Sequence, residues 1–173
     1  VFASGGRVEN VTVDMGPAEF APAKIPAAVR DVPEVIDYPL EVGGREYRIT
    51  CVSMGNPHCV VFCRHLDTLE LDKIGPLFER HPLFPERVNT EFVEVIDRRT
   101  VRMRVWERGS GETLACGTGA CASAVAAVRR GFCDKDAEIT VRLLGGDLQI
   151  RYTDETVYMT GEAKTVFTGE IEV

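Results

Sequence analysis

The sequence predicts an α+β domain in which a curved, mixed β-sheet wraps around one central, buried helix. Short runs with period-two or continuous apolar patterns, typical of strands, occupy most of the chain. Between these runs, residues 119–130 carry small and apolar side chains on every side until the last turn, as expected of a buried helix. Strands before and after a single buried helix favour one sheet packed around it.

The strand-like runs follow one another along the whole chain. The first alternates Val8, Val11 and Val13 with polar residues, and later runs are either alternating or continuously apolar. Glycine pairs at 43–44 and 145–146 predict hairpin turns. The predicted strands are 7–15, 46–53, 59–63, 89–95, 100–106, 138–144, 148–152 and 156–160.

Two segments predict helices. Residues 67–80 place Leu69, Ile74 and Leu77 at loosely amphipathic spacing and end just before Pro82. The second helix, residues 119–130, is followed by Gly131, which can adopt the left-handed conformation of a helix C-cap. The proline-rich stretch 17–39 predicts an irregular entry into a new domain.

Composition and charge restrict the class of protein. Hydrophobic residues make up 45% and charged residues 27%, which is ordinary for a globular protein. No apolar run approaches the roughly 20 residues of a membrane helix, and the first residues lack a signal-peptide pattern, so we expect a cytoplasmic protein without membrane contact. The net charge of −7 and the absence of long Lys/Arg clusters argue against nucleic acid as a partner.

The cysteines are expected to be reduced. Most lie in apolar runs, and a chain of this size without an export signal does not need a disulfide framework. A zinc site from His58, Cys59, Cys63 and His65, with Cys51 added, is disfavoured, because zinc cysteines usually lie in turns rather than in β-branched runs. The six cysteines are Cys51, Cys59, Cys63, Cys116, Cys121 and Cys133.

Cys116 stands apart from the other cysteines because it precedes the buried helix instead of lying on a packed face. It is followed by Gly117, Thr118 and Gly119. The free N–H groups and positive dipole end of a helix bind carboxylates and lower the pKa of a nearby thiol. We therefore expect Cys116 to be a reactive base or nucleophile beside a carboxylate pocket. The alternative is a small buried side chain at a tight glycine turn, the interpretation that we prefer for Cys121.

Several polar residues allow two interpretations. Asn56 is either a turn residue or part of the site around Cys116, and His58 is either a hydrogen-bonded core histidine or part of that site; Asn89 is a turn residue by default. Glu107 and Arg108 make a surface ion pair, or else Arg108 holds a second carboxylate by a two-pronged bond.

Nucleotide and pyridoxal phosphate sites are not expected. The glycines after Cys116 match neither a dinucleotide fingerprint nor a Walker loop. Pyridoxal phosphate needs a Schiff-base lysine, and the four lysines, at 24, 73, 135 and 164, lie outside these segments, so no cofactor is expected.

Three segments in this order resemble diaminopimelate epimerases: GNPHCVVF at 55–62, ERVNTEFVEV at 86–95 and WERGSGETLACGTGACA at 106–122. The resemblance implies two similar α+β domains, each a curved sheet around a central helix, with the active site between them. It also implies interconversion of LL- and meso-diaminopimelate, for lysine and peptidoglycan precursors, by two cysteines without a cofactor or metal.

The resemblance also assigns roles to individual residues. It implies that Cys116 is the catalytic cysteine of the second domain and that His58 and Glu107 tune the pKa of the cysteines. The substrate contacts that it implies are Asn56, Asn89, Glu107, Arg108, Gly117 and Thr118. A related cofactor-independent racemase or isomerase, and a non-catalytic amino-acid-binding module, remain alternatives.

The first domain of that family, with its own cysteine, has no counterpart in this sequence. We therefore expect residues 1–16 to be the tail of the absent domain, 17–161 to be the C-terminal epimerase domain, and 162–173 to be a strand returning to the absent domain. Both end pieces would then lack their sheet. The chain alone is expected to be inactive, with diaminopimelate and the absent domain as partners and a homodimer left open.

Overall fold

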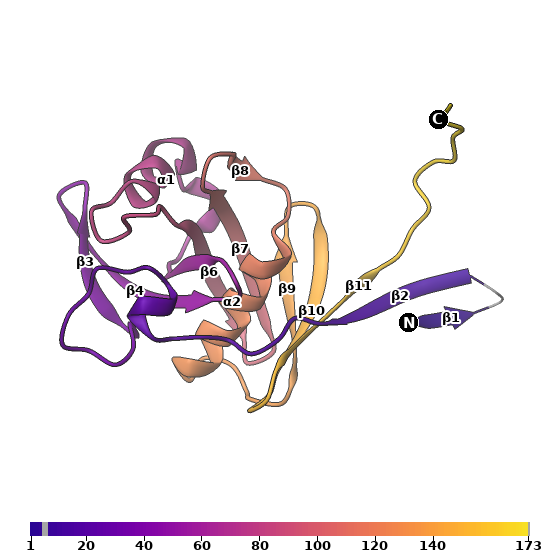
Figure 1. Cartoon of the computed structure of the whole chain (residues 1–173), viewed down its shortest axis with the longest axis horizontal. Helices are drawn as coiled ribbons and strands as arrows, with labels where there is room; N and C mark the ends of the chain where they lie inside the picture. Colours follow the sequence, from indigo (N-terminus) through magenta and orange to yellow (C-terminus); the bar gives the residue numbers. More distant parts are fainter. Residues whose placement is uncertain (5–6, 173) are drawn as a thin grey trace.

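The structure is a computed structural model that describes residues 1–4 and 7–172. Within that part of the chain, eleven strands form one mixed sheet that is accompanied by two α-helices and two 3-10 turns (Figure 1). The helical elements are η1 (Pro22–Lys24), η2 (Leu66–Thr68), α1 (Leu71–Glu79) and α2 (Gly117–Arg129). The strands are β1 (Phe2–Ser4), β2 (Arg7–Asp14), β3 (Tyr38–Val42), β4 (Arg45–Ser53), β5 (Pro57–Phe62), β6 (Asn89–Asp97), β7 (Thr100–Glu107), β8 (Gly111–Thr113), β9 (Glu138–Leu143), β10 (Gly146–Tyr152) and β11 (Val157–Glu162).

The sheet runs in the order β1-β2-β11-β10-β9-β7-β6-β5-β4-β3, and β8 pairs with β7. Two neighbouring pairs, β5–β6 and β7–β9, are parallel, whereas the other pairs are antiparallel. Parallel neighbours need a crossover connection, and each helix lies in one of them. Helix α1 connects β5 to β6, and α2 connects the β7–β8 hairpin to β9. The expected mixed α+β class is confirmed.

Helix α2 forms the centre of one hydrophobic core. Nine of its thirteen residues are buried, and it contacts strands β4, β5, β6, β7, β9, β10 and β11. The helix begins two residues before the predicted start, at Gly117. Gly131 has φ +73°, and the bonds Gly131 N–H to Val128 O and Phe132 N–H to Ala127 O form a Schellman motif, which confirms the predicted C-cap.

The predicted helix 67–80 is wrong in its first part. Residues 66–68 form the short turn η2, Leu69 is extended, and α1 begins only at Leu71. The guanidinium of Arg104, on β7, donates to the carbonyl oxygens of Leu66 and Leu69 at 3.0 and 2.8 Å. These two carbonyls therefore bind a side chain from the sheet instead of continuing a helix.

Three strands were not predicted from the sequence. β3 overlaps the end of the proline-rich stretch 17–39 and is defined by pairing with β4 across the predicted turn at Gly43–Gly44. β8 has only three residues and is held by β7, and β1 is held by β2. Short strands of this kind depend on a partner far more than on their own pattern.

The end pieces differ from expectation. β2 pairs with β11 through residues 10–14, so the prediction that the N-terminal piece lacks a sheet is wrong. Residues 163–172 form no strand, although the Ala163 N–H donates to the carbonyl of Glu9 at 2.9 Å. Residues 5, 6 and 173 of these predicted pieces lie outside the described residues. Strands β1 and β2 and the segment after β11 project from the main body (Figure 1).

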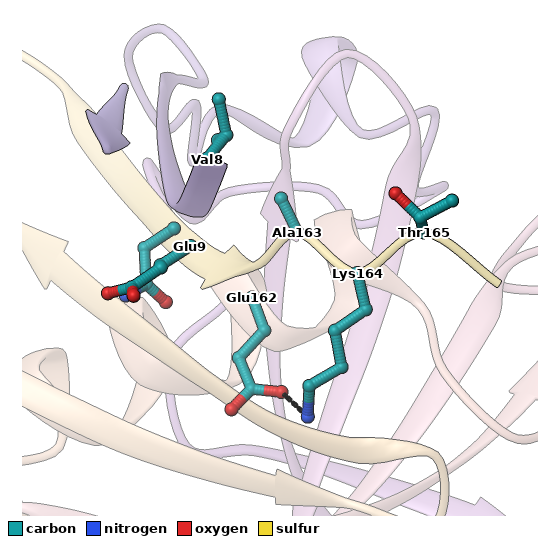
Figure 2. A pocket seen from close by; sticks show the side chains of 7 residues that line it. Val8, Glu9, Glu162, Ala163, Lys164 and Thr165 are labelled. Carbon is teal, nitrogen blue, oxygen red and sulfur yellow. Dashed lines mark ion pairs between the residues drawn. The ribbon is translucent and has the colours of Figure 1, made fainter. Parts of the chain in front are cut away.

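A hollow of about 1120 Å³ lies between these projecting segments, and the ion pair between Lys164 and Glu162 forms part of its lining (Figure 2). Its lining residues are Val8, Glu9, Asn10, Glu162, Ala163, Lys164 and Thr165, none of which was a predicted site residue. Among the described residues, no helix has both the length and the apolar character to span a bilayer.

Helix α1 supports the end of β7. Gly75 lies directly against the indole of Trp106, and the Trp106 Nε1–H donates to Glu79 Oε2 at 2.7 Å. The other carboxylate oxygen of Glu79 accepts the Gly109 N–H and an Arg87 N–H, both at 3.2 Å. A buried carboxylate on α1 thus holds the turn that follows Glu107.

We expect Gly75→Ala to destabilise the chain. A methyl group at this position would lie 2.3 Å from Trp106 Cδ2, near the root of a ring that cannot move aside. Overpacking of this kind costs about 1–3 kcal/mol, whereas the same change inside an unobstructed helix stabilises by about 0.5–1 kcal/mol. Urea unfolding measures the free energy of unfolding, and Asp72→Ala, exposed on the same helix, is the control. A Gly75→Ala chain as stable as the parent would contradict this packing.

Candidate active site

Cys116 is the N-cap residue of α2. Its backbone is extended (φ −139°, ψ 109°), and its carbonyl accepts the first helical bond, from the Ala120 N–H at 2.9 Å. The side chain is 8% exposed, and its Sγ lies 3.6 Å from Thr118 Oγ1. The predicted placement of this cysteine at the start of the buried helix is confirmed.

Close packing leaves no room for a side chain at Gly119 and little at Gly117. A Cβ on Gly119 would lie 2.7 Å from Glu91 Oε1 and 3.2 Å from Cys116 Sγ. A Cβ on Gly117 would lie 3.2 Å from Met159 Sδ. The absence of a side chain at Gly119 lets the carboxyl group of Glu91 on β6 reach the first turn of α2, directly beside the cysteine.

His58, on β5, links that carboxyl group to the loop before its strand. The imidazole is fully buried, with Nδ1 2.6 Å from Glu91 Oε1 and Nε2 2.9 Å from Asn56 Oδ1. The amide Nδ2 of Asn56 donates to Thr118 Oγ1 at 3.2 Å. His58 is therefore a hydrogen-bonded core histidine, as one interpretation predicted, but its partners lead to the cysteine.

Asn89, Glu107 and Arg108 lie together where β6 begins and β7 ends. Asn89 is 3% exposed, and its Oδ1 accepts the backbone N–H of Arg108 at 2.9 Å. The guanidinium of Arg108 donates to the carbonyl of Glu86 at 3.2 Å, and Glu107 Oε1 accepts the hydroxyl of Thr113 at 2.5 Å. Glu107 and Arg108 thus bond to other partners rather than to each other, so the surface ion pair is not the arrangement found.

The expected direction of the Cys116 pKa shift is wrong for this chain. Burial raises the pKa of the Cys116 thiol to about 11, and the negative charges of Glu91 and Glu107 act in the same direction. Hydrogen bonds from Thr118 and from the Gly119 N–H lower the pKa, but they do not offset the loss of hydration. Burial also raises the pKa of Glu91 against the opposing effect of His58.

The remaining cysteines behave as expected of core residues. All six are free, and only Cys63 is more than slightly exposed. Cys51 and Cys59 face each other across β4 and β5, and burial raises the pKa of Cys121 to about 12. In the part of the chain that is described, no group of three or more His, Cys, Asp or Glu side chains is arranged to hold a metal ion.

Sequence reasoning missed two buried carboxylates beside the site, Glu79 and Glu91. The signal for Glu91 was present, because period two puts it on the same strand face as Asn89 and Val93. A charged residue on a face shared with a core valine needs a buried partner. No comparable signal marked Glu79, whose partners Trp106 and Gly109 come from another element.

Alkylation of Cys116 tests its pKa. Because the thiolate is the nucleophile, we expect the iodoacetamide rate at Cys116 to rise about tenfold per pH unit above pH 7. The rate should level off only near a pKa of about 11. Mass spectrometry locates the label, and Cys116→Ser is the control for labelling elsewhere. A rate that is already constant at pH 8 would show a depressed pKa instead.

Solved structures of other proteins share this fold at low sequence identity. The probable proline racemase from Agrobacterium radiobacter superposes with a TM-score of 0.69 at 15% identity, covering 99% of this chain and 56% of that chain. The hydroxyproline epimerase from Agrobacterium vitis gives a TM-score of 0.62 at 18% identity, with 92% and 52% covered. At this identity the likeness concerns the fold alone.

Sequence comparison is more specific. The family model described as diaminopimelate epimerase matches residues 50–166. The diaminopimelate epimerase of Nostoc punctiforme is 54% identical over 164 residues, which is 93% of this chain and 58% of the relative. That of Acetivibrio thermocellus is 53% identical over 171 residues, 97% and 60% respectively. The chain thus spans about three fifths of the length of these curated relatives, and it belongs to the diaminopimelate epimerase family.

Proposed function

We propose that this chain supplies one of two catalytic cysteines for the interconversion of LL- and meso-diaminopimelate. The second cysteine would lie in the part of the relatives' length that this chain does not span. The observation that carries the proposal is the position of Cys116, at the N-cap of a buried helix with glycines on its first turn, in a chain of this family.

Inversion at an α-carbon needs a base on one face and an acid on the other, because a single base returns the proton to the face it left. The Cys116 thiolate would take the α-proton and become a thiol, leaving the electron pair on carbon and delocalised into the substrate carboxylate. A thiol on the opposite face would then give its proton to the α-carbon and become a thiolate. The reverse reaction exchanges the two roles.

The first turn of α2 would stabilise the developing charge. The backbone N–H groups of Gly117 and Thr118 have no carbonyl four residues earlier within the helix, so they can bind the substrate carboxylate. The substrate's α-ammonium, brought beside the sulfur, would favour the thiolate against the effect of burial.

The second charged end of diaminopimelate would contact the cluster at the end of β7. Arg108 is exposed, and among the described residues its guanidinium donates to one backbone carbonyl, so it remains able to bind a carboxylate by two N–H groups. Glu107, Asn56 and Asn89 would complete the substrate contacts. His58 and Glu107 would tune the cysteine.

We further infer that the sheet curves around α2. Strands lie about 4.8 Å apart, so seven flat strands would extend about 29 Å, whereas a helix of thirteen residues is about 20 Å long. A curved sheet is the simplest arrangement in which one helix contacts all seven strands. We also propose that residues 1–16 and 162–173 belong to a neighbouring domain, since Val166 and Phe167 are more than 80% exposed.

A non-catalytic amino-acid-binding module is the second candidate. The pKa of about 11 at Cys116 favours it, because a protonated thiol binds a ligand without exchanging a proton with it. The two candidates differ in whether deuterium from solvent enters the substrate's α-carbon.

We expect the isolated chain not to invert LL-diaminopimelate, because the acid on the opposite face is missing. A chimera in which this chain replaces the matching part of the Nostoc punctiforme relative should invert the substrate and incorporate deuterium at its α-carbon. In that chimera, Cys116→Ala should lower kcat by about 10²–10⁴-fold. The measurement is NMR of the α-proton in D₂O together with separation of the stereoisomers.

Two results would contradict the proposal. The first is inversion by the isolated chain, and the second is a folded chimera whose turnover does not depend on Cys116. Cys121→Ala is the matched control, because this cysteine lies one turn further along α2 inside the core and should leave turnover nearly unchanged.

A further inference from the structure

Two carboxyl groups of the described residues act on Cys116, those of Glu91 and Glu107, and the proposed function does not use Glu91. It is fully buried on β6, with Oε1 on His58 Nδ1 at 2.6 Å. Its Oε2 is buried without a hydrogen-bond partner among the described residues. Gly119 is needed for Oε1 to come this close to the first turn of α2. Burial of a carboxyl group with one unpaired oxygen destabilises the folded chain, and a role in the site would explain why it is present.

The protonation of the Glu91–His58 pair follows from its burial. Neither side chain is exposed, so a net charge on the pair would be uncompensated. Two neutral forms of the pair leave no unpaired hydrogen: a carboxyl group protonated at Oε1 that donates to Nδ1, and a carboxylate that accepts from an imidazolium. In both forms, His58 Nε2 carries a hydrogen. Nε2 is bare only when the imidazole is protonated at Nδ1 alone, and then either the carboxylate is a buried net charge or a carboxyl group protonated at Oε2 has a buried hydroxyl without a partner among the described residues.

The hydrogen on His58 Nε2 sets the direction of every following bond. Asn56 must present its carbonyl oxygen to Nε2–H, and its amide group then donates to Thr118 Oγ1. Because Thr118 Oγ1 already accepts a hydrogen bond, its own hydrogen is free to point at Cys116 Sγ, 3.6 Å away. The opposite direction would turn Asn56 over and direct the Thr118 hydroxyl to Asn56 instead.

We propose that Glu91 is a positioning residue for Cys116: by fixing a hydrogen on His58 Nε2, it directs the chain of bonds through Asn56 and Thr118 so that the hydroxyl of Thr118 donates to the cysteine sulfur. The catalytic meaning of this arrangement rests on the proposed function. The arrangement itself can be measured on the chain without substrate, so failure of the two can be distinguished.

Glu91 also acts on the sulfur through its charge, and the test must separate the two effects. Glu91→Gln and Glu91→Met both remove the carboxylate and have nearly its length, and Glu107 is unchanged in both. Glutamine can still donate from its amide group to His58 Nδ1, because the reverse orientation would bury an unpaired NH₂ group. Methionine cannot make this bond.

The experiment is the rate of iodoacetamide alkylation at Cys116 between pH 7 and pH 10 in these two variants. We expect the rate to be about threefold to tenfold lower in Glu91→Met than in Glu91→Gln, which corresponds to one lost hydrogen bond to the sulfur. Adding Thr118→Val to both variants should abolish the difference, because the last link is cut. Thr90→Val, which removes a buried hydroxyl with no hydrogen-bond partner among the described residues, should leave the alkylation rate at Cys116 unchanged.

Nitrogen NMR of the histidines tests the same arrangement in the unsubstituted chain, so it does not require any variant to fold. In the parent chain we expect His58 Nε2 to be protonated and its hydrogen to be protected from exchange. A bare Nε2 would overturn the proposal. Equal alkylation rates in the two Glu91 variants, or a difference that persists with Thr118→Val, would also overturn it. Loss of deuterium exchange in the chimera with these results intact would count against the proposed function alone.

Discussion

The structure depends on the burial of helix α2. Its first three turns carry only small or apolar side chains, so every face must be covered, and the strands β4, β5, β6, β7, β9, β10 and β11 provide most of that cover. Because the helix lies within the sheet's connections, between the β7–β8 hairpin and β9, its N-terminus emerges beside the ends of β5, β6 and β7. This one constraint places Cys116 near Glu91 of β6 and Glu107 of β7, and the hydrogen bond between Glu91 and His58 connects the site to β5.

Burial has opposite effects on structure and on chemistry. It gives α2 its stability, but it also removes water from the thiol at the end of the helix and raises the pKa of that thiol. The hydroxyl of Thr118 and the backbone N–H of Gly119 lower the pKa of this thiol, but they do not offset the effect of burial. Fixed donors of this kind replace part of the lost hydration, which is the general behaviour of a preorganised polar site.

The end of β7 is held from both sides. Glu79 of α1 binds the Trp106 indole and the Gly109 amide, while Asn89 of β6 binds the Arg108 amide. Packing of Trp106 on Gly75 fixes the strand end further. The backbone at Glu107 and Arg108 is therefore rigid although the Arg108 side chain is exposed, an arrangement that favours recognition of a charged group at low entropic cost.

The sequence by itself determined the α+β class, the buried helix and its Gly131 cap, most strands, and the place of Cys116 before the helix, because these follow from periodicity and glycine positions within a few residues. Only the tertiary structure decided where the helix 67–80 breaks, that β2 pairs with β11, and that β3 and β8 exist, since each depends on a distant partner such as Arg104 or β7. The tertiary structure also decided the direction of the Cys116 pKa shift. Local sequence shows the helix terminus, but desolvation and the charge of Glu91 arise from residues brought together by folding.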